Sequence, residues 1–412
     1  MFKFILASFV LLIWMISLYR KKGSLLLPSV FVLGLYFISV LLSYPHAVVN
    51  DELLSLDPKY FEASIVFLLL LLLYLVPFTN IREDKVKSIV LPNAKTLYIF
   101  SVALICLSLF SIAFFTPVVI NVFSVENLRD ARNLMLQEGA FVNVSIWNTI
   151  ASVSASLYTI ALFLFFIYRA KGTNKKLSIL LLASSLSYVF NVFAYVGRDG
   201  VVFWIFSFLG TYWLFRNYIP LKDRKSIRKY FIIFLMIAIP LFMAITFDRF
   251  SDNPFAGILS YMGQSFPNFC LAFHADYPVS GGNAFPLFKE ILGLPTTESY
   301  SGEFGGTVTW VFGTFIKSFL LNFDIIGTII LGLAMGLILK LTFKKKSSVF
   351  YFHQLFIYFL YFQIYSQGVF YFRQYHRGGN LFIILSFLFY FYFVFVNRYE
   401  RNPVILQLKG NE

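Results

Sequence analysis

The sequence has few charged side chains for its length, and this scarcity excludes an ordinary soluble fold. Only 13% of its 412 residues are charged, against about 25% in typical soluble domains, while 59% are hydrophobic. A soluble protein of this composition would expose apolar surface and aggregate, whereas a lipid bilayer solvates such surface. We therefore expect an all-α, polytopic integral membrane protein.

Cysteine is also scarce, and the usual motifs of metal and nucleotide chemistry are missing. Cys106 lies in an apolar segment and Cys270 in a loop, so a disulfide between them is not expected. The sequence has no Cys/His cluster with zinc spacing, no D-x-D cluster, no Walker-type phosphate loop and no G-x-S-x-G elbow. We expect no metal and no cofactor, and ATP-driven transport and serine hydrolysis are disfavoured.

Long apolar segments recur along the whole chain. About 20 helical residues cross the roughly 30 Å of a bilayer core. Segments that meet this length are expected at 2–19, 25–43, 62–79, 97–116, 146–168, 177–196, 201–215, 231–247, 324–340, 349–367 and 380–397. The first resembles a signal peptide, but no small-residue cleavage site follows it and Arg20, Lys21 and Lys22 lie on its far side. We count it as a span, which gives about eleven spans.

Lys and Arg are distributed unevenly between alternate loops, and this predicts the orientation. One set of segments consists of 20–24, 80–96, 169–176, 216–230, 340–348 and the C-terminal tail. This set has 24 of the 34 Lys and Arg but only 5 of the 20 Asp and Glu. The positive-inside rule places it in the cytoplasm. The N-terminus is then expected outside and the C-terminus inside, and the net charge of +14 indicates topology rather than nucleic-acid binding.

The largest expected outer segment, 248–322, divides the chain into three parts. Residues 1–247 contain eight expected spans and an outer amphipathic helix at 124–138, and residues 323–412 contain three spans and a cytoplasmic tail. Segment 248–322 is rich in Gly, Pro and aromatic residues, which is atypical of disorder. We expect a structured periplasmic loop with interfacial helices, one of them near Trp310–Phe323.

Basic residues at the expected outer boundary oppose the positive-inside gradient. They are Arg129, Arg132, Arg198, Arg249, Lys317, Arg373 and Arg377. Guanidinium groups match phosphate oxygens and stay charged, so several at one depth would form a pocket for a lipid-borne phosphate or pyrophosphate. The alternative is that each contacts lipid head groups singly or pairs with a nearby acid, as Arg198 could with Asp199.

Three short motifs give the chain a resemblance to a known family. They are Tyr195–Gly200 (YVGRDG), Tyr261–Phe269 (YMGQSFPNF) and Trp310–Phe315 (WVFGTF), and an Arg-rich turn at 373–377 accompanies them. The layout resembles the Wzy-type O-antigen or oligosaccharide repeat-unit polymerases of bacteria. These motifs are short, because the family is divergent, while the likeness in layout covers most of the chain.

The resemblance implies a glycosyltransferase of lipopolysaccharide or related polysaccharide biosynthesis in the bacterial cytoplasmic (inner) membrane. A glycan on undecaprenyl pyrophosphate would be transferred, on the outer face, to the non-reducing end of another lipid-linked repeat unit. The expected partners are undecaprenyl-pyrophosphate-linked glycans, the lipid bilayer and a polysaccharide chain-length regulator, with no nucleic acid.

Expected roles follow for individual residues. The catalytic candidates are Arg198, Arg249, Arg373, Arg377, His376 and His274. The substrate-binding candidates are Arg129, Arg132, Asp199, Gln264 and Lys317. Arginines would stabilise the pyrophosphate leaving group, and a general base would deprotonate the attacking sugar hydroxyl. Besides the two histidines, Asp248, Asp252, Asp276 and Glu303 are alternatives for that base. Two flanking arginines would keep His376 neutral.

Other functions stay open at this point. An O-antigen ligase would use the same donor with a lipid A core acceptor, and it would share the spans, the large outer loop and the arginines. A lipid-linked oligosaccharide flippase should have charges deep inside its spans and short loops on both sides. A membrane acyltransferase should have a catalytic histidine inside a span, and His353 has no evident acidic partner in the sequence.

Overall fold

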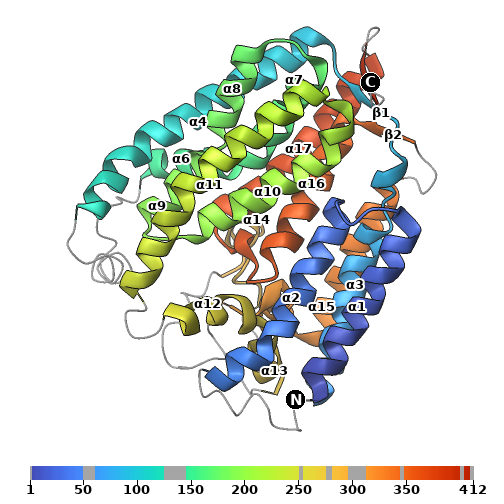
Figure 1. The fold of residues 1–412 in the computed structure, drawn as a ribbon, viewed down its shortest axis with the longest axis vertical. Helices are drawn as coiled ribbons and strands as arrows, with labels where there is room; N and C mark the ends of the chain where they lie inside the picture. The colour runs from blue at the N-terminus through green and yellow to red at the C-terminus, as the bar shows by residue number, and fades with distance from the viewer. Residues whose placement is uncertain are drawn as a thin grey trace. The chain divides into compact units, whose positions relative to one another are not determined.

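A computed structural model describes residues 2–49, 61–124, 145–249, 254–274, 281–295, 312–343, 348–399 and 403–408. Within these residues the chain is almost entirely helical (Figure 1). Eight of the described helices are long and apolar enough to cross a membrane, or nine if the bent pair α6 and α7 forms one span. This arrangement fits a multi-pass membrane protein.

The helices and strands have the following bounds. The helices are α1 (Phe2–Lys22), α2 (Pro28–Val49), α3 (Phe61–Thr79), α4 (Ala94–Phe123), α6 (Ile146–Ser156), α7 (Tyr158–Lys171), α8 (Lys175–Ser184), α9 (Ser187–Ala194), α10 (Asp199–Phe215), α11 (Leu221–Arg249), α12 (Pro254–Gly263), α13 (Ser265–His274), α14 (Pro286–Ile291), α15 (Thr314–Thr342), α16 (Phe352–Gln367) and α17 (Arg377–Tyr399). Short 3-10 turns are η3 (Glu83–Lys85), η4 (Arg216–Tyr218) and η5 (Arg373–Tyr375), and the strands are β1 (Ser88–Leu91), β2 (Val349–Tyr351) and β3 (Val404–Gln407).

The chain divides into two compact units, each built from segments that are distant in sequence. Unit 1 contains Met1–Lys85, Phe255–Ser347 and Leu360–Ile384, and unit 2 contains Val86–Pro254, Ser348–Phe359 and Leu385–Glu412. The boundary passes through α16 and α17, so each of these helices contributes one part to each unit.

Unit 1 is a bundle in which α1, α2, α3 and α15 lie side by side and α13 packs against three of them (Figure 1). Its core is aromatic. Phe67 on α3 lies 4.9 and 5.1 Å, between ring centroids, from Phe266 and Phe269 on α13. Tyr74 on α3 lies 5.1 Å from Phe315 on α15. Offset and edge-on aromatic pairs of this kind add to the dispersion energy of close packing.

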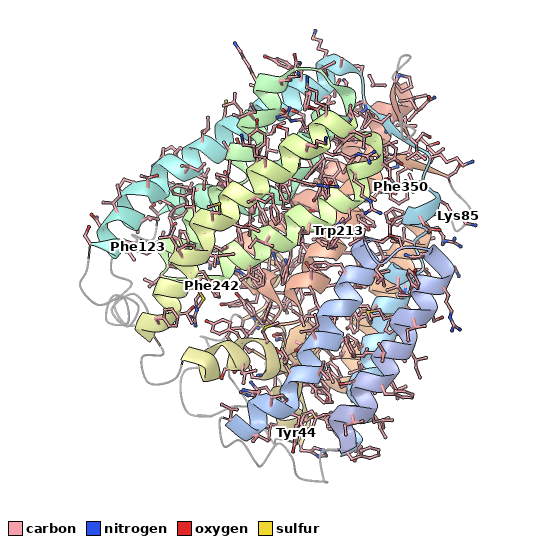
Figure 2. The ribbon with its side chains drawn as sticks, viewed as in Figure 1. Tyr44, Lys85, Phe123, Trp213, Phe242 and Phe350 are labelled. Atoms are coloured by element: carbon pink, nitrogen blue, oxygen red, sulfur yellow. The ribbon has the colours of Figure 1, made fainter. Side chains whose placement is uncertain are left out.

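Unit 2 has a core of phenylalanines contributed by four helices (Figure 2 shows the side chains). Phe100 on α4 contacts Phe352 and Phe356 on α16, and Phe389 and Phe393 on α17. Phe163 on α7 adds contacts to the same α16 rings. Because lipid is as apolar as these rings, close packing rather than hydrophobic exclusion holds such helices together.

A small sheet in unit 2 joins three expected cytoplasmic segments. The strand order is β2-β1-β3. Strand β1 pairs parallel with β2, with Ser88 opposite Val349, and antiparallel with β3, with Ser88 opposite Gln407. Main-chain hydrogen bonds therefore hold the loop after α3, the loop after α15 and the C-terminal tail together.

A buried ion pair in unit 1 joins the ends of α1, α2 and α3. The Lys22 ammonium contacts the Glu83 carboxylate and donates to Ser29 Oγ and to the Ile81 carbonyl, each at 2.7 Å. The same carboxylate accepts from the Ser29 amide at 3.0 Å, so it caps the amino end of α2. Both charged side chains are fully buried, and these hydrogen bonds offset the cost of removing two charges from water.

Each expected span coincides with a helix, but the predicted count of eleven is not confirmed. The segments 201–215 and 349–367 correspond to α10 and α16, which have 17 and 16 residues. Helices of this length reach only about 25 Å, which is short of the roughly 30 Å of bilayer core.

The large expected outer loop contains helices among its described residues. They are α12, α13, α14 and the first part of α15. The expected helix before the late span begins at Thr314 and is broken at Asp324, where φ is 58°; Trp310 lies outside the described residues. The expected helix at 124–138 also falls outside them, apart from Ser124, which ends α4 as its C-terminal cap.

The Lys22–Glu83 pair generates a stability prediction. Glu83→Met leaves a buried, unpaired ammonium, and we expect a loss of about 3–5 kcal/mol in unfolding free energy. The double variant Lys22→Met, Glu83→Met removes both charges and should recover much of that loss. Glu290→Gln, which breaks the exposed pair with Arg377, should cost under about 1 kcal/mol. Denaturation in detergent measures all three variants, and a double variant less stable than Glu83→Met would contradict this account.

Candidate functional site

The turn between α9 and α10 in unit 2 positions Arg198. The Gly197 amide donates to the Val192 carbonyl at 2.9 Å, and the Val196 amide to the Phe193 carbonyl at 2.9 Å. This is the Schellman pattern that ends many helices, usually with glycine at the left-handed position. Here Val196 occupies that position, with φ of 53°. A β-branched residue in this region is strained, and such strain is concentrated at functional sites.

Two glycines let this turn pack closely against α9. A Cβ atom added at Gly197 would lie 2.6 Å from Val192 Cγ1, and one added at Gly200 would lie 2.7 Å from Val192 Cβ. No side chain larger than hydrogen fits at either position without movement of Val192. The Gly-Arg-Asp-Gly spacing of the sequence therefore has a steric cause, and Arg198 and Asp199 lie between the two glycines.

Arg198 is a buried cation at the amino end of a helix. Its residue surface is 1% exposed, its Nη1 donates to Thr246 Oγ1 at 2.7 Å, and its guanidinium lies 5.8 Å from the ring centroid of Phe242 on α11 (Phe242 is labelled in Figure 2). The amino end of a helix has a partial positive charge. Asp199 supplies an acidic side chain in the first turn of the same helix, and a bound anion would also interact favourably with this helix end.

Unit 1 has a second buried basic side chain, Lys317, in the first turn of α15. Its residue surface is 2% exposed, and its Nζ lies 3.5 Å from the Phe312 carbonyl. Asn268 on α13 donates to that same carbonyl at 2.8 Å. A Cβ atom added at Gly313 would lie 2.0 Å from Lys317 Cδ, so the lysine chain folds directly over this glycine.

The chain around Lys317 is fastened to the end of α16. The Gly313 and Thr314 amides donate to the Phe370 carbonyl, and the Phe315 amide donates to the Gly368 carbonyl at 2.8 Å. The free amides of one helix thus satisfy the free carbonyls at the end of another. Thr314 has φ of 67°, so a second β-branched residue in the left-handed region lies three residues before the buried Lys317.

The basic turn η5 follows α16 and is held by Asn380. The Asn380 Nδ2 group donates to the Gln374 carbonyl at 2.6 Å and to the Ala284 carbonyl at 3.2 Å, and its Oδ1 accepts from the Leu287 amide at 3.2 Å. This one buried side chain links the basic turn to α14. Within the turn, Gln374 is buried and donates to Gln367 at 3.2 Å, while Arg373 is half-buried.

The two residues that follow η5 differ in their surroundings. Arg377 is exposed and pairs with Glu290 on α14, so its charge is partly neutralised. The surrounding protein, and then the charge of Arg373, lower the pKa of His376 to about 3, although the residue itself is exposed at the surface. His376 is therefore neutral at physiological pH, as a proton acceptor must be.

The remaining predicted residues are distributed as follows. Gln264 is buried between α12 and α13, and His274 is exposed at the end of α13; both belong to unit 1. Asp199 is half-buried beside Arg198 in unit 2. Arg249 is the last residue of α11, and its side chain is not described. Arg129, Arg132, Asp252, Asp276 and Glu303 lie outside the described residues, and the side chain of Asp248 is likewise not described.

The structure thus brings together two sets of predicted residues. In unit 1, hydrogen bonds join the segment before Lys317 to the end of α16 and the basic turn after it. In unit 2, Arg198 lies on the strained turn before α10 and contacts α11 through Thr246 and Phe242. Sequence reasoning missed Asn268 and Asn380, whose only signal was an amide in or beside an apolar segment. Gln363, Ser366 and Gln367 on α16 are also buried.

Comparison with protein-family models, with curated proteins and with solved structures finds no match to this chain. The class that fold and site define is a polytopic helical membrane protein with buried cations at helix ends. Its resemblance to the polymerase family rests on the short motifs and on the layout of the sequence.

The packing of Gly200 generates a second prediction. An alanine in the first turn of a helix normally stabilises it, but Gly200→Ala would collide with Val192, and we expect a loss of about 1–3 kcal/mol. Val192→Ala in the same chain should restore most of the stability. Gly34→Ala is the control, because nothing lies within 4 Å of the added atom. A Gly200→Ala protein as stable in thermal denaturation as the control variant would contradict the close packing.

Proposed function

We propose that the chain crosses the membrane eleven times, with its N-terminus outside and its C-terminus in the cytoplasm. The sheet supports this count. Strand β2 immediately precedes α16 and β3 follows α17, yet both pair with β1. A chain that leaves one face and returns to it must cross an even number of times. Because α17 is a candidate span, α16 would supply the second crossing despite its 16 residues.

A similar argument applies to α10. Arg169 at the end of α7 lies 3.8 Å from Asp223 at the start of α11, so these two helix ends share one side. Between them the chain passes through α8–α9, a candidate span, and α10. An even number of crossings then requires α10 to cross as well. Together with the nine spans counted when α6 and α7 form one, α10 and α16 complete eleven.

We propose further that the protein polymerises lipid-linked oligosaccharide repeat units on the outer face of a bacterial cytoplasmic membrane. The single observation that supports this most is the burial of Arg198 and Lys317, each at the amino end of a helix. Each would bind the pyrophosphate of a lipid carrier, because the helix end and the buried cation both attract an anion. The basic turn with Arg373 would provide further charge.

The proposed chemistry is substitution at a sugar carbon. A hydroxyl oxygen of the acceptor glycan attacks the anomeric carbon of the donor, and the bond from that carbon to the pyrophosphate oxygen breaks. The lipid pyrophosphate leaves with the electron pair, and the basic residues stabilise its growing charge. The hydroxyl proton passes to a base, for which His376 is a candidate because it directly follows the basic turn η5.

A deletion strain of the source organism tests this proposal. Wild-type protein should restore a ladder of surface polysaccharide on a gel, and Arg198→Gln and Lys317→Gln should each leave a single repeat unit. Lys175→Gln removes an exposed charge at the predicted cytoplasmic end of α8 and is the control. Membrane expression of every variant is checked by immunoblot.

Three outcomes would contradict the proposal. Full ladders from Arg198→Gln and Lys317→Gln, with both variants expressed, would show that neither basic side chain is required for polymerisation. Polymer that accumulates on its lipid carrier in the deletion strain would indicate a ligase. Repeat units trapped on the cytoplasmic face would indicate a flippase.

A further inference from the structure

The first two turns of α11 and the preceding turn η4 form a strongly basic surface in unit 2. Residues 169–176 and 216–230 contain ten Lys and Arg and a single acid, Asp223. That acid lies 3.8 Å from Arg169. The cluster also stands at the amino end of a 29-residue helix, which has a partial positive charge of its own. This surface would attract an anion.

Three arginines of this surface are close enough to repel one another. The pKa of Arg216 is lowered from its usual value, mainly by burial. Tyr212 raises this pKa, whereas the positive charges of Arg224 and Arg228 lower it. Arg224 and Arg228 are four residues apart on α11, so they share one face. The group of Arg216, Arg224 and Arg228 is called the α11 arginine cluster below.

The two arginines on α11 are anchored in a way that leaves their terminal nitrogens available. Arg224 Nε donates to the Ile219 carbonyl at 2.8 Å, and Arg228 Nε donates to Tyr212 Oη at 3.2 Å. Among the described residues, the Nη groups of these two side chains make no hydrogen bond. Each guanidinium is thus held in place through Nε and presents its remaining donors, which is the geometry that binds phosphate oxygens bidentately.

The surface beyond the cluster indicates which kind of phosphate would bind. Ile232 and Met236 follow Arg228 by four and eight residues on α11, so they lie on the same side of the helix, and they are 55 and 72% exposed. A soluble phosphate would leave this apolar face unused, whereas acyl chains would cover it. Basic pockets beside membrane-spanning helices are typical binding sites for anionic lipid head groups.

We propose that the α11 arginine cluster binds the phosphate of an anionic phospholipid whose acyl chains lie along the apolar face of α11. This site is separate from Arg198 and Lys317 and does not depend on the proposed function. It also differs from a general attraction of positive loops to the membrane, because it assigns binding to one helix face.

A matched pair of variants tests the assignment. Arg224→Gln with Arg228→Gln removes two charges from the cluster face, and Lys225→Gln with Lys229→Gln removes two charges from the adjacent exposed face. Purified full-length protein is titrated with phosphatidylglycerol, with phosphatidylcholine and with inorganic phosphate, and bound lipid is counted by native mass spectrometry. Wild-type protein should prefer phosphatidylglycerol to phosphatidylcholine by about 10-fold or more, and the arginine pair should lose that preference, whereas the lysine pair should keep it.

Further measurements keep the result interpretable. Circular dichroism verifies that both double variants are folded, and Arg224→Lys with Arg228→Lys keeps the charge but removes the guanidinium forks, so it should restore only part of the preference. An equal loss in the arginine and lysine pairs would overturn the proposal in favour of general surface charge. Displacement of phosphatidylglycerol by an equal concentration of inorganic phosphate would overturn the assignment to a lipid. A wild-type protein with no preference between the two lipids would also overturn it.

Discussion

Main-chain hydrogen bonds between β1, β2 and β3 are the constraint on which the rest of the arrangement depends. They join segments near residues 88, 349 and 407, so the chain that leaves one of these strands must return to the same side of any membrane that it crosses before it reaches the next. The Tyr218 hydroxyl adds a further tie, since it donates to the Val86 carbonyl at 2.8 Å. Loops that we assign to the cytoplasm from their Lys and Arg content alone are thus connected by hydrogen bonds. The uneven distribution of Lys and Arg and the strand pairing are independent observations, and both support the same topology.

A second recurring feature of the structure is the burial of ionisable side chains at helix ends. Lys22 and Glu83 neutralise each other and have a structural role, because they join the ends of α1, α2 and α3. Arg198 and Lys317 are positioned differently, because each follows a β-branched residue in the left-handed region and each lies at the positive end of a helix. Strain and unfavourable electrostatics at the same places are costly to stability. Such a cost is expected where a protein keeps a site ready for an anion, which is why we propose a lipid-borne pyrophosphate as the ligand.

The positions of the helices were largely predictable, because apolar segments of about 20 residues have no stable alternative in a bilayer. The break between the interfacial and spanning parts of α15 was also visible in the sequence, since Asp324 interrupts an apolar segment. The Lys22–Glu83 pair could not be predicted, because 61 residues separate its members and charge counts treated both as loop residues. Nor could the roles of Asn380 and Gly313, since their partners come from other helices. The pairing of Arg377 with Glu290 likewise depends on the placement of α14.

Cysteine labelling in intact cells tests the topology most directly. In a background without Cys106 and Cys270, the single changes Tyr195→Cys, Asn217→Cys, Tyr351→Cys and Arg377→Cys place a thiol at each end of α10 and α16. A membrane-impermeant maleimide added outside should label the variants at 195 and 377, and those at 217 and 351 only after permeabilisation. Labelling of the 195 and 217 variants from the same side, or of the 351 and 377 variants from the same side, would contradict the eleven-span account.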